Sequence, residues 1–287
     1  MSKWLKWQII LGLGLSVCLA SAKADEAVQL KYKFSPGQVL RYDGKQSMTV
    51  ESTVSGADQK HSYQITSVRE WKVLGVDQEG NVRITMTIVR AQVEATSPDG
   101  KAITFDTEKD GDQNPLAAVI GKPLVEAKLS PFGQVLDIQQ AQASAPGQFV
   151  ALARTLFYPV PSVPVKPGTA WQQDLDLPLP PPLGNNETIR IRQTFRLEKV
   201  VDSVAFINLQ STPAEEIKDK ARMARIAQFL PSGRIELDLS RGVLRVADLA
   251  LDQTVTDFAG NDSVQRVTGS HREVLKDELA GSPARPQ

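Results

Sequence analysis

Residues 80–95, GNVRITMTIVRAQVEA, show the alternation that is typical of a half-buried β-strand. Val82, Ile84, Met86 and Ile88 fall on one face, and the residues between them are polar. After Ile88 the apolar residues move to the opposite set of positions, which predicts a bulge or sharp bend that curves the sheet. We therefore expect a long strand whose Ile84, Met86 and Ile88 lie in the core or on an apolar binding face.

Similar alternating segments recur along the chain and are separated by short turn phrases such as Ser-Pro-Asp-Gly at 97–100 and Ser-Arg-Gly at 240–242. Proline fixes one turn angle and glycine accepts positive φ, so these phrases reverse the chain. Short reversals pair neighbouring strands antiparallel. The sequence predicts a mainly antiparallel β (α+β) fold, a large bent sheet or half-barrel built from two unequal β-rich halves with about three covering helices.

The phrase Gly-Gln-Val-Leu occurs twice, each time just after Ser-Pro, as SPGQVLRYD at 35–43 and SPFGQVLDI at 130–138. A phosphate-binding loop would lead its backbone amides into a helix. Both copies lead instead into alternating residues that are typical of a strand. We interpret the phrase as a turn that starts a strand.

Three helices are predicted from capping and periodicity, over residues 114–121, 146–159 and 212–230. Asn114 and Pro115 are suited to begin the first helix, and Thr212 with Glu215 resembles the capping box of the third. The second helix has one apolar face, formed by Phe149, Leu152, Ala153, Leu156 and Phe157.

Residues 1–24 have the order of a secretory signal peptide, with a basic start, an apolar run from Ile9 to Ala20 and an Ala-x-Ala site. We expect cleavage after Ala24 and export to the periplasm or the extracellular space. The run of 12 residues is shorter than the roughly 20 that cross a bilayer, so no transmembrane segment is expected in the mature chain. Lipidation at Cys18 is an alternative, although Val17 stands where a smaller residue is usual.

A proline-rich stretch at 158–184, with 8 of the 18 prolines, divides the remaining chain. The expected segments are a first β-rich half at 25–158, a second at 159–279 that packs with it in one continuous domain or as a tight pair, and a disordered tail at 280–287. We interpret the stretch as a stiff crossover between the halves. A polyproline ligand for a partner is the alternative.

The composition excludes several classes of function. Loss of Lys3, Lys6 and Lys23 with the signal peptide leaves 30 basic against 33 acidic residues, without basic clusters, so nucleic acid is not an expected partner. Cys18 is the single cysteine, which leaves no thiol for disulfides, zinc or catalysis in the mature chain. No cofactor motif is present, and none is predicted.

Acid–base residues are sparse. His61 and His271 are 210 residues apart in polar contexts, and we interpret both as solvated. Carboxylate pairs that alternate along strands are compatible with a hydrolase, but solvated strand faces carry the same pattern. These pairs are Asp174 with Asp176 and Glu236 with Asp238. The sequence therefore predicts no catalytic residue.

One acidic phrase, DTEKDGDQNPLA at 106–117, resembles the first half of a calcium loop. Its candidate ligands are Asp106, Glu108, Asp110 and Asp112. A calcium loop needs a bidentate glutamate at the twelfth position, where this chain has Ala117. A solvated acidic turn is the preferred interpretation, and no metal is expected.

Three phrases in a fixed order carry a resemblance: LKYKFSPGQVLRYD, IGKPLVEAKLSPFGQVLDI and VPVKPGTAWQQDLDLP. Together they resemble a family of exported, β-rich bacterial proteins of unknown function. The matching positions are Lys33, Phe34, Gly37, Tyr42, Gly121, Lys122, Ser130, Pro131, Gly133, Val135, Pro164, Val165, Gly168 and Trp171. The resemblance implies export and a β-rich fold, and it supplies no catalytic residue.

The preferred hypothesis is a non-enzymatic protein of the bacterial cell envelope that binds a hydrophobic small molecule such as a lipid. Its binding face would combine Phe149, Leu152, Leu156 and Phe157 of the second helix with Ile84, Met86 and Ile88. The same residues are equally compatible with an ordinary core. The alternatives are a scaffold or interaction module that binds an envelope protein and, third, a carboxylate-based hydrolase.

Overall fold

The computed structural model describes residues 26–97, 99–111, 117–142, 148–179 and 187–279. The predicted signal peptide, Cys18, Asp112, Asn114, Pro115 and the predicted tail at 280–287 lie outside these ranges. No helix in the described ranges is long and apolar enough to cross a membrane.

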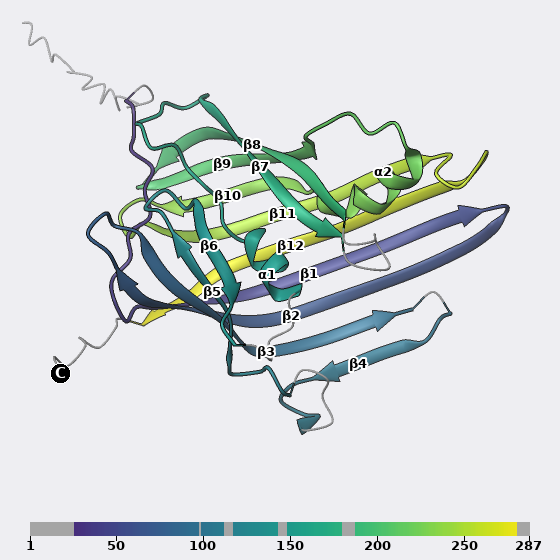
Figure 1. The fold of residues 1–287 in the computed structure, drawn as a ribbon, viewed down its shortest axis with the longest axis horizontal. Coiled ribbons are helices and arrows are strands. Elements are labelled where there is room, and N and C mark those ends of the chain that lie inside the picture. Colours follow the sequence, from purple (N-terminus) through teal and green to yellow (C-terminus); the bar gives the residue numbers. More distant parts are fainter. Residues whose placement is uncertain (1–25, 98, 112–116, 143–147, 180–186, 280–287) are drawn as a thin grey trace, which may run out of the picture.

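The described residues form one open, antiparallel sheet (Figure 1). The strand order is β6-β5-β3-β2-β1-β12-β11-β10-β9-β8-β7, and β4 pairs with β3 beside this path. The strands are β1 (Val39–Val54), β2 (Ala57–Val76), β3 (Val82–Thr96), β4 (Ala102–Asp106), β5 (Pro123–Leu129), β6 (Val135–Gln140), β7 (Ala170–Leu179), β8 (Glu187–Val201), β9 (Val204–Pro213), β10 (Ser232–Asp238), β11 (Val243–Thr256) and β12 (Val264–Leu279). The predicted mainly antiparallel β fold is confirmed.

The long-range contact that completes this sheet is the pairing of β1 with β12. It runs from Val39 opposite Leu279 to Thr53 opposite Val264, with one shift in register between Arg41 and Tyr42. The other neighbours in the sheet follow one another along the chain, apart from β3 and β5, which pair across β4. Strands from both predicted segments, 25–158 and 159–279, therefore share one sheet.

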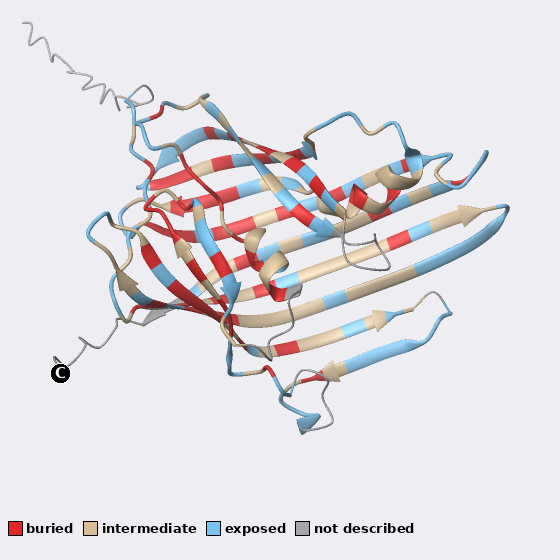
Figure 2. Ribbon diagram, viewed as in Figure 1, coloured by how far each residue is buried: buried red, intermediate tan, exposed pale blue. Residues whose placement is uncertain are grey.

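The two faces of the sheet differ in polarity. Leu40 and Tyr42 of β1 and Leu249 of β11 lie on the concave face and are buried. The alternate positions face outward and carry ion pairs between neighbouring strands, such as Arg272 with Asp248 (2.6 Å) and Arg192 with Asp174 (2.8 Å). Figure 2 shows the buried residues gathered toward one end of the sheet, whereas the far ends of the longest strands are mostly half-buried or exposed.

The bend predicted in β3 is confirmed as a shift in strand register. Arg69 of β2 lies opposite Ile88, but Val68 lies opposite Arg90, so Val89 has no partner in this pair. Ile88 is 7% exposed and Val89 is 38% exposed. The bulge keeps the apolar positions on the concave face while the strand changes direction.

The repeated Gly-Gln-Val-Leu phrase is a turn at the start of a strand in both copies. Gly37 has a φ of +79° and Gly133 a φ of +76°. β1 begins at Val39 and β6 at Val135, the valines of the two phrases. This interpretation of the sequence is confirmed.

The described residues contain two α-helices, not about three. α1 (Gln148–Arg154) lies within the predicted range 146–159, and residues 117–121 form turns. The prediction that a helix begins after Thr212 is wrong, because β9 continues to Pro213, which lies opposite Ile191 of β8. Thr212 and Pro213 pair with β8 as part of the sheet and do not form the predicted capping box.

The helix that does form in this region, α2 (Lys220–Ile226), begins after Asp219. The Asp219 carboxylate accepts hydrogen bonds from the backbone N–H groups of Ala221 (2.9 Å) and Arg222 (3.2 Å). This is the usual role of an N-cap residue. A short 3-10 helix, η2 (Ala227–Phe229), follows directly.

The proline-rich crossover packs against the core over its described part. Tyr158, Val160 and Val165 are buried, and Val165 forms a two-way backbone bridge with Val28. For residues 158–170, these contacts favour a stiff crossover and do not favour an exposed polyproline ligand. Pro180, Pro181 and Pro182 lie outside the described residues.

We expect Gly133→Ala to destabilise the fold more than Gly100→Ala. Both glycines have positive φ, and a non-glycine residue there costs about 1–3 kcal/mol. A Cβ at Gly133 would also lie 2.6 Å from the Tyr32 ring, whereas at Gly100 it would meet nothing within 4 Å. Urea unfolding of both variants measures the difference, and equal losses would contradict this packing.

Candidate functional site

A large cavity of about 670 Å³ lies on the concave face, between the sheet and the helical segments. Ligand pockets typically have volumes of about 300–1,000 Å³. Its apolar lining comes from elements that are distant in sequence: Met48, Ala151, Leu152, Leu156, Leu175, Leu177, Pro178, Ile191, Phe229, Pro231, Leu249 and Leu251. Polar residues complete the lining: Gln46, Ser47, Tyr63, Thr155, Tyr158, Gln193, Gln228, Ser270 and His271. The cavity therefore has the size of a ligand site, and its lining suits a largely apolar molecule that carries a polar group.

The cavity lies where three hydrophobic clusters approach one another without merging. Leu156 and Leu249 belong to the main core, Leu251 to a second cluster beside α2, and Leu177 and Ile191 to a third. All five residues line the cavity. The apolar side chains at this point thus surround a space that they do not fill.

Strand alternation explains one wall of the cavity. Leu175 and Leu177 of β7 lie opposite Ile191 and Ile189 of β8, on the concave face. The residues between them point outward, so the wall is apolar inside and charged outside.

The carboxylates of this wall face away from the cavity. Asp174 pairs with Arg192 (2.8 Å) and Asp176 with Arg190 (2.8 Å). Hydrogen bonds from these arginines hold the pKa of both carboxyl groups below its usual value. Two ionised carboxylates on an exposed surface lack the raised pKa that a general acid requires.

The second predicted carboxylate pair, Glu236 and Asp238, also interacts with groups outside the cavity. Glu236 lies between Arg234 (3.1 Å) and Arg245 (3.8 Å). Asp238 accepts a hydrogen bond from the Ser240 hydroxyl (2.6 Å) in the turn before β11. Neither residue lines the large cavity.

The predicted calcium candidates form a turn held by its own hydrogen bonds. The Asp106 carboxylate accepts from the Glu108 N–H (3.0 Å) and pairs with Lys109 (3.4 Å), and Glu108 pairs with Arg90 (3.1 Å). The Asp110 carboxylate accepts from the Asp106 N–H (2.6 Å). Within the described ranges, no group of three or more His, Cys, Asp or Glu side chains could hold a metal ion.

The structure divides the residues that were predicted to form one apolar face between two pockets and the core. Ile84, Leu156 and Phe157 line a small pocket of about 50 Å³. Leu152, which is 37% exposed, and Leu156 line the large cavity. Phe149 is buried in the main core, and Phe157 packs on Trp71 with ring centroids 5.1 Å apart. The three candidates from β3, Ile84, Met86 and Ile88, are buried core residues.

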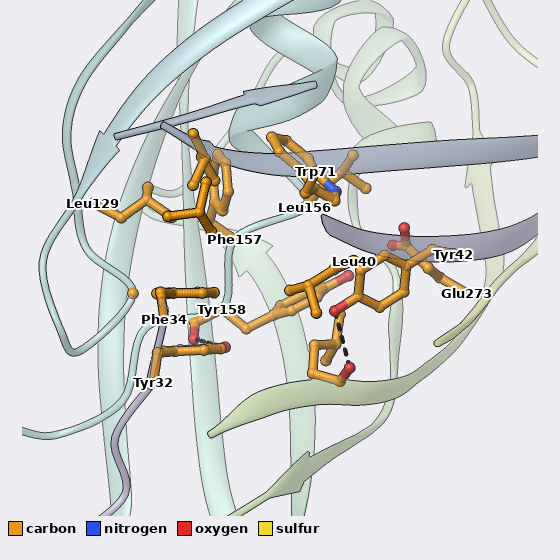
Figure 3. Close-up of a pocket in the computed structure, with 14 residues that line it drawn as sticks. Tyr32, Phe34, Leu40, Tyr42, Trp71, Leu129, Leu156, Phe157, Tyr158 and Glu273 are labelled. Atoms are coloured by element: carbon orange, nitrogen blue, oxygen red, sulfur yellow. Dashed lines mark hydrogen bonds between the residues drawn. The ribbon is translucent and has the colours of Figure 1, made fainter. Parts of the chain in front are cut away.

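A second, much smaller pocket of about 50 Å³ lies next to the cavity and is lined by six aromatic and six aliphatic residues, together with Gly133 and Glu273 (Figure 3). Its hydroxyl groups are mostly paired: Tyr32 donates to the Tyr158 carbonyl (2.8 Å) and Tyr42 to the Leu244 carbonyl (3.0 Å). This space holds only a few water-sized molecules, because one water needs roughly 10–15 Å³. Tyr158 lines both the small pocket and the large cavity.

A buried ion pair connects three strands beside these pockets. Arg69 of β2 contacts Glu273 of β12 at 2.9 Å, with side-chain exposures of 7% and 2%. The two residues reach each other across Gly44 of β1, where a Cβ would lie 3.1 Å from the Arg69 guanidinium. A glycine in the interior of a strand often marks such a close approach.

His271 lies beside the Arg69–Glu273 pair and lines the cavity. Its Nε2 lies 3.8 Å from the Glu273 carboxylate, and its ring lines the large cavity. Burial opposes ionisation of Glu273, but Arg69 and His271 outweigh it and hold the pKa of Glu273 below its ordinary value. His271 was expected to be solvated, but its side chain is 19% exposed, because it lies on the cavity side of β12, whereas the next residue, Arg272, faces outward and is 57% exposed.

Comparisons with known proteins concern the fold alone. No protein-family model matches the chain, and no curated protein matches its sequence. A chain of lipovitellin, from a structure concerned with lipid–protein interactions, is similar with a TM-score of 0.52 and 13% identity. The match covers 89% of this chain and 26% of the lipovitellin chain.

A second solved structure, the secretin of a Salmonella type III secretion injectisome in its open-gate state, matches with a TM-score of 0.16 and 8% identity. That match covers 87% of this chain and 62% of the secretin chain. A TM-score this low supports no conclusion about the fold. The resemblance to exported bacterial proteins stays a prediction.

Arg69→Met should destabilise the protein by about 3–5 kcal/mol, because it leaves the Glu273 carboxylate buried and unpaired. Arg192→Met removes an exposed partner and should cost less than about 1 kcal/mol. The double variant Arg69→Met, Glu273→Leu should recover much of the stability. Urea unfolding measures all three, and similar losses for the two single variants would rule out this role of the pair.

The same ion pair should make stability depend on pH in the acid range. The pKa of Glu273 is lower in the folded protein than its ordinary 4.5, so its contribution is present above that pH and is lost as pH falls through the folded value. We expect the Arg69→Met, Glu273→Leu variant to gain stability relative to wild type between about pH 6 and about pH 3. Parallel unfolding curves at each pH would show this gain, and a constant difference would contradict it.

Proposed function

We propose that this chain is an exported, non-enzymatic protein of the cell envelope that binds an apolar molecule such as a lipid. The observation that carries the proposal is the cavity of about 670 Å³ with its apolar lining. Each methylene group transferred from water into such a site contributes about 0.8 kcal/mol. An acyl chain of about ten carbons would thus gain roughly 8 kcal/mol, before the cost of immobilising it.

The distribution of charge on the sheet supports the same proposal. Ion pairs between neighbouring strands cover the outward face, for example Arg266 with Asp252 (3.0 Å) and Lys60 with Glu51 (2.8 Å). The concave face carries the apolar lining. A protein with this asymmetry keeps a soluble outer surface while it shields an apolar molecule from water.

The likeness to lipovitellin agrees with this proposal. That structure concerns lipid–protein interactions, and its similar part covers most of this chain. Because the match covers 26% of the lipovitellin chain, it relates this sheet to one part of a larger protein. Export rests on the pattern of residues 1–24, with a basic start, an apolar run and Ala22-Lys23-Ala24.

Leu152→Arg should abolish most apolar ligand binding without unfolding the protein. Leu152 lines the cavity and is 37% exposed, so a guanidinium there can reach water in the free protein but would be desolvated by an apolar ligand. The matched control is Leu136→Arg on β6, at a leucine that is 51% exposed and does not line the cavity. Fluorescence titration with N-phenylnaphthylamine measures the affinity.

We expect at least roughly tenfold weaker binding for Leu152→Arg, corresponding to about 1.4 kcal/mol, and unchanged binding for Leu136→Arg. Both variants should unfold near the wild-type temperature. Equal affinities for the wild type and both variants would show that the probe binds elsewhere and would remove the support for this site.

A further inference from the structure

Two buried polar groups on the cavity wall have no partner within hydrogen-bond distance among the described residues, and the one on His271 lies 3.8 Å from the Glu273 carboxylate. These groups are the Tyr158 hydroxyl and Nε2 of His271. Tyr158 is 3% exposed, the His271 side chain is 19% exposed, and both residues line the large cavity. Buried hydroxyl and imidazole groups are nearly always hydrogen-bonded, so two such groups in one cavity point to a ligand that supplies the missing partner.

Neighbouring tyrosines show that the fold can satisfy buried hydroxyl groups. Tyr32 and Tyr42 each donate to a backbone carbonyl, at 2.8 Å and 3.0 Å. Figure 3 shows the Tyr158 ring pointing away from Tyr32, with its hydroxyl beside Leu40 and Tyr42 on the side of the pocket that holds Glu273. Burial, followed by the charge of Glu273, raises the pKa of Tyr158, so its hydroxyl stays protonated and can donate a hydrogen bond.

The charges beside these groups limit what the partner can be. Glu273 is buried and already paired with Arg69 at 2.9 Å, and His271 lies 3.8 Å from the same carboxylate. No lysine or arginine is among the described residues that line the large cavity, so an anion placed there would lose its hydration without a cationic partner on the wall. An uncharged oxygen group avoids this cost and can still bond to a hydroxyl and an imidazole.

We propose that Tyr158 and His271 bind the uncharged oxygen headgroup, a hydroxyl or an ester, of a ligand whose apolar chain lies against α1, β7 and β8. This inference rests on the proposed function and specifies its ligand class. The Tyr158 hydroxyl donates to the headgroup oxygen. His271 Nε2 accepts from a hydroxyl headgroup or, in the other tautomer, donates to an ester carbonyl.

The test compares laurate derivatives that share a chain and differ in headgroup. Lauryl alcohol, methyl laurate and laurate each displace N-phenylnaphthylamine from wild-type protein, Tyr158→Phe and Tyr42→Phe. Tyr42→Phe is the matched control, because its hydroxyl is bonded to Leu244 and the residue does not line the large cavity. Thermal unfolding of all three proteins completes the comparison.

We expect wild-type protein to bind lauryl alcohol and methyl laurate more tightly than laurate. Tyr158→Phe should weaken both neutral ligands roughly three- to tenfold, the range of one hydrogen bond, and leave the affinity for N-phenylnaphthylamine unchanged. Its melting temperature should not fall, since an unpartnered hydroxyl is removed, whereas Tyr42→Phe should lower the melting temperature and leave ligand affinity unchanged.

A second pair of variants tests the other headgroup residue. His271→Leu should weaken the two neutral ligands selectively, and His61→Leu should not, because His61 does not line the cavity. His271→Gln retains a hydrogen-bonding side chain and should restore part of the affinity.

Several results would overturn the headgroup site while leaving the proposed function intact. These are tighter binding of laurate than of lauryl alcohol, unchanged affinities in Tyr158→Phe, and an equal loss for the neutral ligands and N-phenylnaphthylamine. A lower melting temperature for Tyr158→Phe than for Tyr42→Phe would assign the hydroxyl a structural role instead. If neither N-phenylnaphthylamine nor any laurate derivative binds the wild-type protein, the proposed function fails, and the headgroup site fails with it.

Discussion

The pairing of β1 with β12 is the constraint on which the rest of this structure depends. It joins the strands before the crossover to those after it, so that one wide sheet forms where two smaller ones would otherwise remain. Arg69 of β2 and Glu273 of β12 form an ion pair across β1, and Gly44 of β1 leaves the space for their contact. A buried pair of this kind adds little net stability, but losing one partner is costly, so the pair favours this register over others.

A wide sheet with one apolar face has to cover that face, and this chain covers it unevenly. At one end, aromatic side chains such as Trp71 and Phe157 pack closely. α1 contributes Phe149 and Ala153 to this same main core, whereas α2 contributes Ala224 and Ile226 to two separate clusters. The cavity is the space between them, and a ligand chain would complete the packing that the protein leaves open.

Much of the fold could be predicted from sequence because its signals are local. The alternation in β3, the bulge at Val89 and the positive φ of Gly37 and Gly133 each depend on a few adjacent residues. The helix predicted from Thr212 was wrong for the complementary reason: a local capping pattern was overruled by pairing with β8. Local patterns identify the elements, and long-range pairing decides between competing interpretations of them.

The site itself was only partly visible in the sequence. Leu152 and Leu156 were candidates for an apolar binding face and do line the cavity, whereas Ile84, Met86 and Ile88 are buried in the core. The polar end was missed, since Arg69, Tyr158 and His271 come together only when distant strands pair. Gly44 and Gly269, each in the interior of a strand, were local signals of a close approach there.

Native mass spectrometry of protein purified from its own cell envelope can show whether the cavity holds a ligand. We predict a second mass species that exceeds the polypeptide by one small molecule and disappears after extraction with organic solvent. The extract should contain a neutral compound with an apolar chain and a hydroxyl or ester group. A single, unliganded mass from freshly isolated protein, together with no uptake of such compounds after delipidation, would show that the cavity is not a binding site for them.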